Sequence, residues 1–483
     1  MRRGPEKLPF PKLIIFALGQ LGWSLASYGV GNLVNYFYLP PDTAVSVVFP
    51  PFIYQGAIAG MLTVIGAITF VGRAFDSVTN PLIASWSDRS TARLGRRRLF
   101  MLVSAVPFSL FSVLVFVPLQ HFSCQPSLAS SWANAAWLAA AILLFYFFFV
   151  MYTAPYNALI SELGHNPREL LLISTMISVT WALGFGIGTQ VYQLQGIFEQ
   201  SGMNPVSAFQ AVQMVFGGLS LVLMLLPVAV IDERKYAAHS VSKEGTIQAL
   251  RSVLRNRNFC LLLVTELLYF VCQTVMQVGL VYYVVTLLKL DKGVTSVLLP
   301  LMFALSFAFY YPVVKATVRL EKKRVLLAAF FLLILLFLCF AVMGLLPVRA
   351  LPYACAVAVF AALPMAALGI IPNAIVADIA EADGIETGDF KAAMFFGIRA
   401  FVDNLGMAIG NMLFSFFLTL GKSVENPLGI RVSAVVSLCV CVLATTVFFA
   451  YDEGMVLKSL RKKEFPGSGE SHKKESTAAP AAG

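Results

Sequence analysis

The sequence predicts an all-α integral membrane protein, and its composition and the spacing of its apolar residues carry this prediction. Hydrophobic residues make up 58% of the 483 residues, and charged residues make up only 12%. A soluble protein would have about a quarter charged residues. The apolar residues gather in stretches of the length that crosses a bilayer as a helix, about 20 residues. Because lipid offers the backbone no hydrogen-bond partners, these stretches must be helices packed as a bundle.

We expect twelve membrane-spanning helices. The first begins a few residues after Arg2 and Arg3 and runs to about Leu39. It is too long for the apolar core of a signal peptide and lacks a small-residue cleavage site, so it is expected to remain as a helix. The tail after Asp452 is rich in Lys, Ser, Gly, Pro and Ala, which predicts disorder. The twelve spans are predicted to begin near Leu13, Phe52, Leu99, Ala135, Leu170, Phe209, Phe259, Val294, Val325, Tyr353, Ala392 and Val432.

The chain divides at one long polar stretch, from Asp232 to Asn258. Within it, Thr246–Leu254 has apolar residues at helical spacing and predicts a short amphipathic helix on the membrane surface. The loops after the second and eighth spans are both short and basic. Two similar six-helix halves with a substrate cavity between them are the arrangement of the major facilitator fold. The expected units are a first half at 1–232, a central loop at 233–257, a second half at 258–452 and a tail at 453–483.

Lys and Arg are distributed unevenly about the predicted spans. Of these 35 residues, 28 fall on one side of the membrane, five on the other, and two, Arg73 and Arg399, inside spans. The positive-inside rule therefore places both termini in the cytoplasm. The same asymmetry accounts for the net charge of +10, so nucleic acid is not an expected partner. The seven cysteines form no CxxC motif or Cys/His cluster, and we expect neither a disulfide nor a metal site.

Charged residues in the second span are the first candidates for a functional site, because ionisable groups are costly inside a membrane. Arg73, Asp76 and Asn80 are spaced by three and four residues, which places them on one helix face. Asp76 is suited to hold a proton or a small cation, Asn80 offers a carbonyl oxygen, and Arg73 favours the ionised form of Asp76. A structural Arg73–Asp76 pair that fixes helix packing is the alternative.

The eleventh span carries a second charged set. Arg399 and Asp403 are four residues apart, with Asn404 beside them, and this spacing predicts a pair along one helix face. The pair is interpreted as a structural contact or an inter-helix latch, or as a contact to substrate. Glu266 in the seventh span is expected about two turns from the cytoplasmic end. Polar neutral residues at helical spacing, Gln273 and Gln277, follow it on the same span and would line a cavity or bond a neighbouring helix.

Several segments, in order along almost the whole chain, resemble one known family. The resemblance lies in RAFDSVTNPLIASWSDRSTARLGRRR at 73–98, YTAPYNALISEL at 152–163, LRSVLRNRNF at 250–259, IVADIAEADGIETG at 375–388 and AMFFGIRAFVDNLGMAIG at 393–410. These segments are similar to those of the glycoside–pentoside–hexuronide:cation symporters of the major facilitator superfamily, the family of melibiose permease. Animal lysolipid symporters share its fold and its second-helix pattern.

The resemblance implies a cation site on the second helix, with Asp76 as its first acid and Asn80 in the place of its second acid. It also implies a sugar site whose charged residues are replaced here. The tentative substrate-binding residues have three origins. They are the replacements Ser24, Thr153, Asn157 and Asn404, the tryptophans Trp23 and Trp181, which are suited to stack on a sugar, and the polar Gln273 and Gln277 of the seventh span. Asp88, Arg89 and Arg96 resemble the superfamily's signature loop, which implies gating between the halves or a role in anchoring topology.

The leading interpretation is a cation-coupled symporter that moves a small organic solute, a glycoside or related sugar compound, by alternating access. One alternative is a transporter of lysolipids or other amphiphiles, which the lost sugar-binding charges favour. Another is a non-transporting membrane receptor or scaffold. No nucleophile–base pair or metal cluster is visible, so an enzyme is not expected. The expected location is the cell membrane, the expected functional unit is a monomer, and no cofactor is expected beyond a transported Na⁺ or H⁺.

Overall fold

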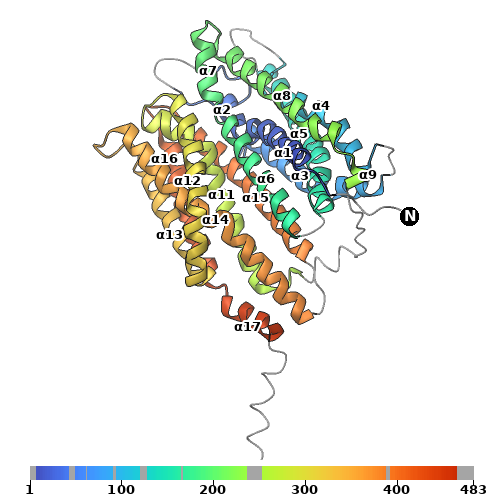
Figure 1. Ribbon diagram of the computed structural model, residues 1–483. Helices are drawn as coiled ribbons and strands as arrows, with labels where there is room; N and C mark the ends of the chain where they lie inside the picture. Colours follow the sequence, from blue (N-terminus) through green and yellow to red (C-terminus); the bar gives the residue numbers. More distant parts are fainter. Residues whose placement is uncertain are drawn as a thin grey trace, which may run out of the picture.

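The computed structural model describes residues 7–42, 49–60, 62–90, 94–119, 128–164, 167–236, 253–387 and 392–464. This part of the chain is almost entirely helical, with one short hairpin of β1 (Ala57–Ala59) and β2 (Leu62–Thr63). Its helices form two groups that meet at one end and diverge toward the other (Figure 1). Eleven helices are long and apolar enough to cross a membrane. The 26-residue helix α3 (Val64–Arg89) packs among them and is the expected twelfth span.

The first group contains the helices that precede the central loop. Its first span is continuous through α1, a π-helical turn η1 and α2. The bounds are α1 (Phe10–Tyr28), η1 (Gly29–Leu33), α2 (Val34–Tyr38), α3, α4 (Arg96–Leu114), α5 (Leu128–Leu163), α6 (Pro167–Gly188), α7 (Val191–Gln200), α8 (Pro205–Val230) and α9 (Glu233–Tyr236).

The second group has the same design. Its first helix, α11, also ends in a π-helical turn, η2, so the opening helix of each group contains this irregular geometry. The bounds are α11 (Arg257–Tyr282), η2 (Tyr283–Leu287), η3 (Lys292–Val294), α12 (Thr295–Arg319), α13 (Lys322–Ala341), α14 (Ala350–Thr387), α15 (Ala392–Thr419), α16 (Leu428–Phe449) and α17 (Glu453–Glu464).

The two groups repeat the same helix pairings. In the first group α1 packs against α8 and α6, α5 against α4 and α3, and α4 against α8. In the second group α11 packs against α16 and α15, α14 against α13 and α12, and α13 against α16. The contacts between the groups follow the same rule, since α3 packs against α15 and α6 against α12. Two halves related in this way are the parallel repeat of the major facilitator fold.

Polar side chains begin several of these helices. Thr63 Oγ1 accepts a hydrogen bond from the backbone N–H of Gly66 at the start of α3, at 3.0 Å. Asn204 and Asn256 accept in the same way from Ser207 and Phe259 at the starts of α8 and α11. Such caps satisfy backbone donors that the first turn leaves free. The Thr63 cap explains why α3 begins at Val64 and not near Phe52. The predicted start of the second span is therefore wrong by twelve residues.

Two further expectations concern the chain outside the spans. The tail was predicted to be disordered from 453, but Glu453–Glu464 forms helix α17, which packs against α14. The prediction for the tail is therefore wrong over this helix, and its remainder, 465–483, lies outside the described residues. The predicted amphipathic helix Thr246–Leu254 also lies almost entirely outside them.

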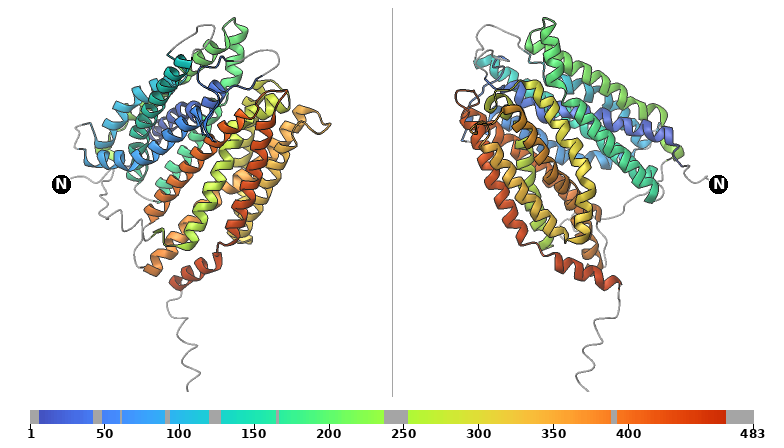
Figure 2. Two further views of the ribbon diagram at one scale, coloured as in Figure 1. Left: turned by 180° about the vertical axis from the view of Figure 1, so that it is seen from behind. Right: turned by 60° about the vertical axis from the view of Figure 1, so that its left-hand side comes forward.

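Hydrogen bonds and ion pairs join the halves at one end of the molecule. Asn35 bonds Asn411, and the Tyr282 hydroxyl donates to the Leu39 carbonyl oxygen at 2.8 Å. Ser296 Oγ donates to the Thr189 carbonyl oxygen at 2.6 Å. Two ion pairs lie further out, Lys292–Glu199 at 2.7 Å and Lys422–Asp42 at 3.7 Å. The positive-inside rule predicts that this is the outer end, and we call it so below; from it the two halves separate (Figure 2).

Candidate functional site

Asp76 lies at the middle of α3 and is almost fully buried. Only 2% of the residue is exposed, and its Oδ1 atom has no hydrogen-bond partner among the described residues. A carboxylate held in this way at membrane depth is costly unless a cation or a proton compensates it. The position predicted from sequence thus has the burial that a coupling site requires.

Arg73 lies one turn before Asp76 and contacts a different partner. Its guanidinium stacks over the ring of Tyr146 in α5, 5.4 Å from the ring centre. It also approaches span 1 closely, since a Cβ atom added to Gly31 would lie 3.3 Å from Arg73 Nη2. Within the described part of the chain, no ion pair joins Arg73 to Asp76. Arg73 therefore influences Asp76 through space, and Tyr146 holds it by a cation–π contact.

Asn80 is placed differently from Asp76. It lies one turn further along α3 and is exposed, whereas Asp76 is buried. Among the described residues no hydrogen bond joins the two side chains, and one is buried while the other is accessible. Asn80 instead belongs with the exposed polar side chains that lie in the inner half of the spans.

A second charged cluster lies in the other half. Arg399 Nε is 2.7 Å from both Glu266 carboxylate oxygens, and it is 3.9 Å from Asp403 Oδ2. Arg399 Nη1 donates to the Asn373 amide oxygen. Three helices, α11, α14 and α15, thus converge on one guanidinium. Its main partner is Glu266 on another helix, while Asp403 on its own helix lies farther away than the i,i+4 spacing suggested.

Several polar side chains in the spans are exposed in the structure. Asn80, Asn157, Ser174 and Asn373 come from four helices, α3, α5, α6 and α14, and each lies in the half of its helix nearer the inner end. Polar groups at membrane depth face a bundle interior or a water-filled cavity. Their exposure shows that these four polar groups are accessible in the inner half of the spans.

The tentative substrate residues occupy three environments. Asn157 is exposed, and Trp23, Trp181, Gln273, Gln277 and Asn404 are half-buried. Ser24 and Thr153 are buried, and their hydroxyls donate to the backbone oxygens of Leu21 and Phe149. Ser24 lies where α1 packs closely on Gly184 of α6. A Cβ atom added to Gly184 would be only 2.7 Å from the Leu21 carbonyl oxygen. In this state, both hydroxyls are bonded within their own helices.

Two of the half-buried residues have unpaired polar atoms. Trp23 Nε1 and Gln273 Oε1 are buried without a partner among the described residues. Trp23 contacts Phe149 edge-on, with ring centres 5.7 Å apart. Trp181 lies at the contact between the halves, against Phe303 of α12, with ring centres 6.2 Å apart. The unpaired Trp23 N–H group and Gln273 oxygen are suited to a solute rich in hydroxyl groups, because each hydroxyl both donates and accepts.

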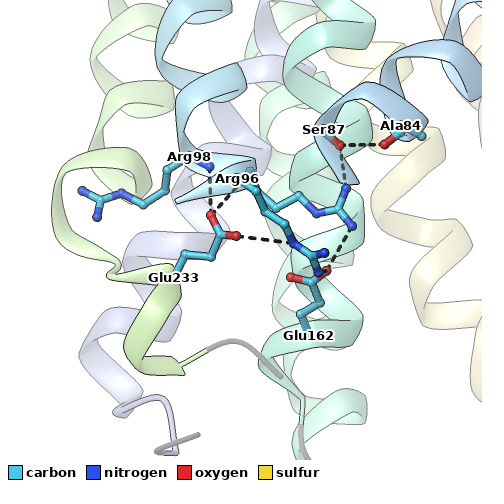
Figure 3. A network of polar contacts seen from close by, with 7 residues as sticks. Ala84, Ser87, Arg96, Arg98, Glu162 and Glu233 are labelled. Atoms are coloured by element: carbon cyan, nitrogen blue, oxygen red, sulfur yellow. Dashed lines mark hydrogen bonds and ion pairs between the residues drawn. The ribbon is translucent and has the colours of Figure 1, made fainter. Parts of the chain in front are cut away.

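The inner end of the first half holds an ion network built around the start of α4 (Figure 3). Arg96 Nη2 and Arg97 Nη2 lie 2.7 and 3.0 Å from Glu162 Oε1 at the end of α5. Glu233 Oε2 accepts from the backbone N–H groups of Arg97 and Arg98, at 2.9 and 3.1 Å. This carboxylate caps α4, and its negative charge suits a helix N-terminus.

The second half repeats this network. Glu453 accepts from the backbone N–H groups of Lys322 and Lys323 at the start of α13, at 3.0 and 2.9 Å. Lys322 Nζ pairs with Asp378 of α14 at 2.5 Å. Arg96 was predicted to act between the halves, but in this structure its ion pairs lie within the first half. Arg89 is exposed, and the Asp88 side chain lies outside the described residues.

Sequence reasoning missed the partners that come from distant helices. Tyr146, Glu162, Glu233 and Asn373 were not predicted as site residues. Glu162 and Glu233 carried a signal, since each is an acid next to a predicted span end. Tyr146 and Asn373 carried none, because a Tyr or Asn in a span acquires its role only from the helix packed against it.

Comparisons with known proteins agree with this architecture. The chain is 23% identical over 442 residues to a glucuronide carrier protein homolog of Escherichia coli, covering 87% of this chain and 90% of that protein. It is 26% identical to an uncharacterized symporter of Synechocystis over 48% of this chain, and 22% identical to the isoprimeverose transporter of Lactiplantibacillus pentosus over 48%. These two alignments span only 39% and 47% of the relatives' own lengths.

Solved structures show the same fold. The nucleoside transporter NupG superposes with a TM-score of 0.67 at 13% identity, over 92% of this chain and all of that chain. A bacterial homolog of the human lysosomal transporter Spinster, in an inward-facing form, gives 0.60 at 14% identity, over 93% of this chain and 97% of that chain. The family model described as MFS/sugar transport protein matches residues 15–451. The chain is therefore a multi-pass membrane protein and belongs to the MFS/sugar transport protein family.

Proposed function

We propose that the protein is a symporter that couples the movement of a glycoside to the movement of a proton through Asp76. The observation that carries the coupling is the buried carboxylate at the centre of α3, whose Oδ1 atom has no partner among the described residues. An acid that must lose its proton before a conformational change, and regain it afterwards, links proton movement to that change.

A proton suits this site better than a sodium ion. Asn80 replaces the second acid that the family resemblance implies, and it is exposed whereas Asp76 is buried. Hard cations take several oxygen ligands at once, and among the described residues no group of acidic, His or Cys side chains surrounds Asp76. A single carboxylate is sufficient for a proton.

A glycoside is the solute that the surroundings support. Relatives are named for glucuronide and isoprimeverose transport. The exposed residues Asn80, Asn157 and Asn373 are neutral hydrogen-bonding groups. Trp23 and Trp181 supply apolar faces of the kind that pack on a sugar ring. The two halves of one chain supply all of these groups, so we propose a monomer as the functional unit.

The structure represents one state of the transport cycle. The contacts at the outer end close the path on that side, while the polar residues near the inner end remain accessible. A solute in this state exchanges with the inner side. Opening the outer end requires breaking the Lys292–Glu199 and Lys422–Asp42 pairs, and the solute and proton then exchange on the other side.

Uptake by proteoliposomes containing the full chain tests the proposal. The probes are radiolabelled isoprimeverose, p-nitrophenyl β-glucuronide and lysophosphatidylcholine, each with an imposed proton gradient, a sodium gradient or none. We expect accumulation of a glycoside with the proton gradient alone. Asp76→Asn should abolish accumulation and leave counterflow exchange, whereas Glu425→Gln, an exposed loop variant, should behave like the parent.

Other outcomes would replace the proposal. Transport of lysophosphatidylcholine alone would establish the amphiphile alternative, and no transport of any probe would favour a receptor or scaffold. Sodium-driven uptake would retain Asp76 and change the cation. Normal accumulation by Asp76→Asn would remove Asp76 from the mechanism.

A further inference from the structure

We propose that Glu266 and Asp403 together hold one exchangeable proton, at a second site in the half of the molecule opposite to Asp76. That such a proton is carried in the transport cycle rests on the proposed function, but its binding does not. The argument is made from the charges in the cluster, from the atoms that are already paired, and from the access of the cluster to the inner side.

The cluster has one negative charge too many. Glu266 and Asp403 are two acids around a single cation, Arg399, and both lie within ion-pair distance of it. Asn373, the fourth member, is neutral. Exposed fractions of the side chains are 3% for Glu266, 15% for Asp403 and 12% for Arg399, so water screens these charges poorly. Burial of an uncompensated charge is costly, and one bound proton makes the cluster neutral.

The hydrogen bonds indicate where the proton is accommodated. Arg399 Nε lies 2.7 Å from both oxygens of Glu266, and Arg399 Nη1 bonds the Asn373 oxygen. Asp403 lies farther from the guanidinium, at 3.9 Å, and its Oδ1 atom is buried without a partner among the described residues. Asp403 thus supplies the free oxygen, while Glu266 is held by the cation.

Other charged and titratable groups around Asp403 do not supply the missing charge. On α11, Tyr269 lies close enough to interact electrostatically with both Glu266 and Asp403. Tyr310 of α12 and Cys441 of α16 are near enough to interact electrostatically with Tyr269. Helix α3 also packs against α15, and its charged residues near the middle, Arg73 and Asp76, are one cation and one acid. A neutral Tyr or Cys adds no positive charge, and within the described residues no ion pair joins Arg73 to Glu266 or Asp403.

The donor set favours a proton over a metal ion. The oxygens of Glu266 and Asn373 already accept from Arg399, which leaves the Asp403 carboxylate as the free ligand of the cluster. A single carboxylate does not replace the hydration shell of a metal cation. A proton needs one oxygen, and the O–H bond that forms on Asp403 is the bond that breaks when water accepts the proton.

The cluster is connected to the side from which a proton would exchange. Asn373 is exposed in the inner part of α14, and it bonds Arg399 directly. Arg399 and Asp403 lie on α15, which packs against α3 across the contact between the halves. We therefore expect the proton to exchange with the inner side through the exposed Asn373 region. The proton-binding residues belong to the second half and would move with it.

Infrared difference spectroscopy of the full chain in liposomes tests the proposal without any solute. A pH step that begins at about pH 6, above the range in which exposed carboxyl groups titrate, and ends in the alkaline range should remove the C=O stretch of carboxyl groups that are still protonated. We expect the loss of two such groups in the parent, one from Asp76 and one from the Glu266–Asp403 site. Asp403→Asn should lose the second signal, and Asp76→Asn should keep it. Arg399→Lys, which preserves the charge, should also keep it.

Glu266→Gln is the independent variant, because it leaves Asp403 alone with Arg399 and removes the excess charge by a different route. It should also lose the second signal, and Glu425→Gln should leave both signals unchanged. Size-exclusion chromatography and circular dichroism identify which variants are folded. If Asp403→Asn does not fold, Glu266→Gln decides the question.

The outcomes separate this inference from the proposed function. A second signal that persists in folded Asp403→Asn or Glu266→Gln overturns the site, as does a parent with no signal beyond that of Asp76. A signal that is lost in Asp403→Asn and absent at Asp76 supports this site and contradicts coupling through Asp76. A count of protons released in the same pH step, using an indicator dye, should fall by one per chain in each informative variant.

Discussion

The side-chain amide of Asn35 donates a hydrogen bond of 2.8 Å to the amide oxygen of Asn411, and both residues are buried where the first half meets α15 of the second. A polar bond in this position stabilises the state in which the outer end is closed. Opening that end must break it, and the energy of the bond therefore enters the balance between the two access states.

We predict that Asn35→Ala or Asn411→Ala shifts the balance toward the outer-open state, because each leaves the other amide buried and unpaired. A loss of about 1 kcal/mol corresponds to roughly a fivefold change in the ratio of states. Electron–electron distance measurements between spin labels at Ser201→Cys and Glu425→Cys, in a chain with its native cysteines replaced, report this ratio. The double variant should shift less than either single variant, and an additive shift would contradict the prediction.

The second prediction concerns the order of stabilities in the charged cluster of the second half. Arg399→Gln leaves two buried acids without a cation and should lower the free energy of unfolding by about 3–5 kcal/mol. Glu266→Gln and Asp403→Asn each leave one acid with Arg399 and should cost less. Thermal unfolding of the purified variants gives the order. Equal losses for all three would show that the charges do not act as one cluster.

The third prediction is a pH dependence at the outer end. Lys422 Nζ donates to Gln55 at 2.9 Å, and its side chain is only 12% exposed. Burial lowers the pKa of Lys422, and the nearby Asp42 carboxylate offsets this only in part. We expect opening of the outer end to expose the Lys422 amine and to return its pKa to the ordinary value. The outer-closed state therefore binds the proton on Lys422 less tightly than the outer-open state. Raising the pH through the alkaline range should therefore favour the outer-closed state.

The same spin-label distances, measured across this range of pH, test the sign. Lys422→Met removes the titrating amine and should remove the alkaline dependence. Lys289→Met, at another lysine that the sequence places on the outer side, is the matched control. A dependence of opposite sign, or one that survives in Lys422→Met, would rule out this lysine as its source.

The fourth prediction concerns the caps at the inner end. Glu233→Gln weakens two charge-assisted hydrogen bonds to the start of α4, and Glu453→Gln does the same at α13. We expect each to lower the free energy of unfolding by about 1–3 kcal/mol. Glu425→Gln, which is exposed, should have no effect. A large loss for one cap and none for the other would contradict the equivalence of the two networks.

Much of the fold follows from the sequence, because each span is a local feature. Apolar length and loop charge predict where helices cross. Ten of the twelve predicted starts fall within four residues of a helix start, and Ala135 lies seven residues after the start of α5. The remaining one, Phe52, lies in an apolar stretch that turns through the β1–β2 hairpin before Thr63 caps α3. Apolar composition alone does not distinguish such a turn from the first residues of a span.

The site was less accessible to sequence reasoning, because its pairs join residues far apart in the chain. The i,i+4 rule predicted Asp403 as the partner of Arg399, whereas Glu266, 133 residues away, lies closer. The same rule joined Asp76 to Asn80, which the structure separates by burial. Spacing identifies residues that share a face, but the helix that packs on this face determines which of them are paired.

The repeated pairings described above have a consequence for the solute. Helices α3, α11 and α15 carry charges near their middles, whereas their counterparts α12, α1 and α6 carry charged residues only near their ends. The two halves thus share the same helix packing but differ in the charged residues that they carry near mid-helix. A carrier with the same charged groups in both halves would not distinguish between two opposite orientations of a bound solute. Here the halves differ, so the two ends of a solute between them would face different charged groups.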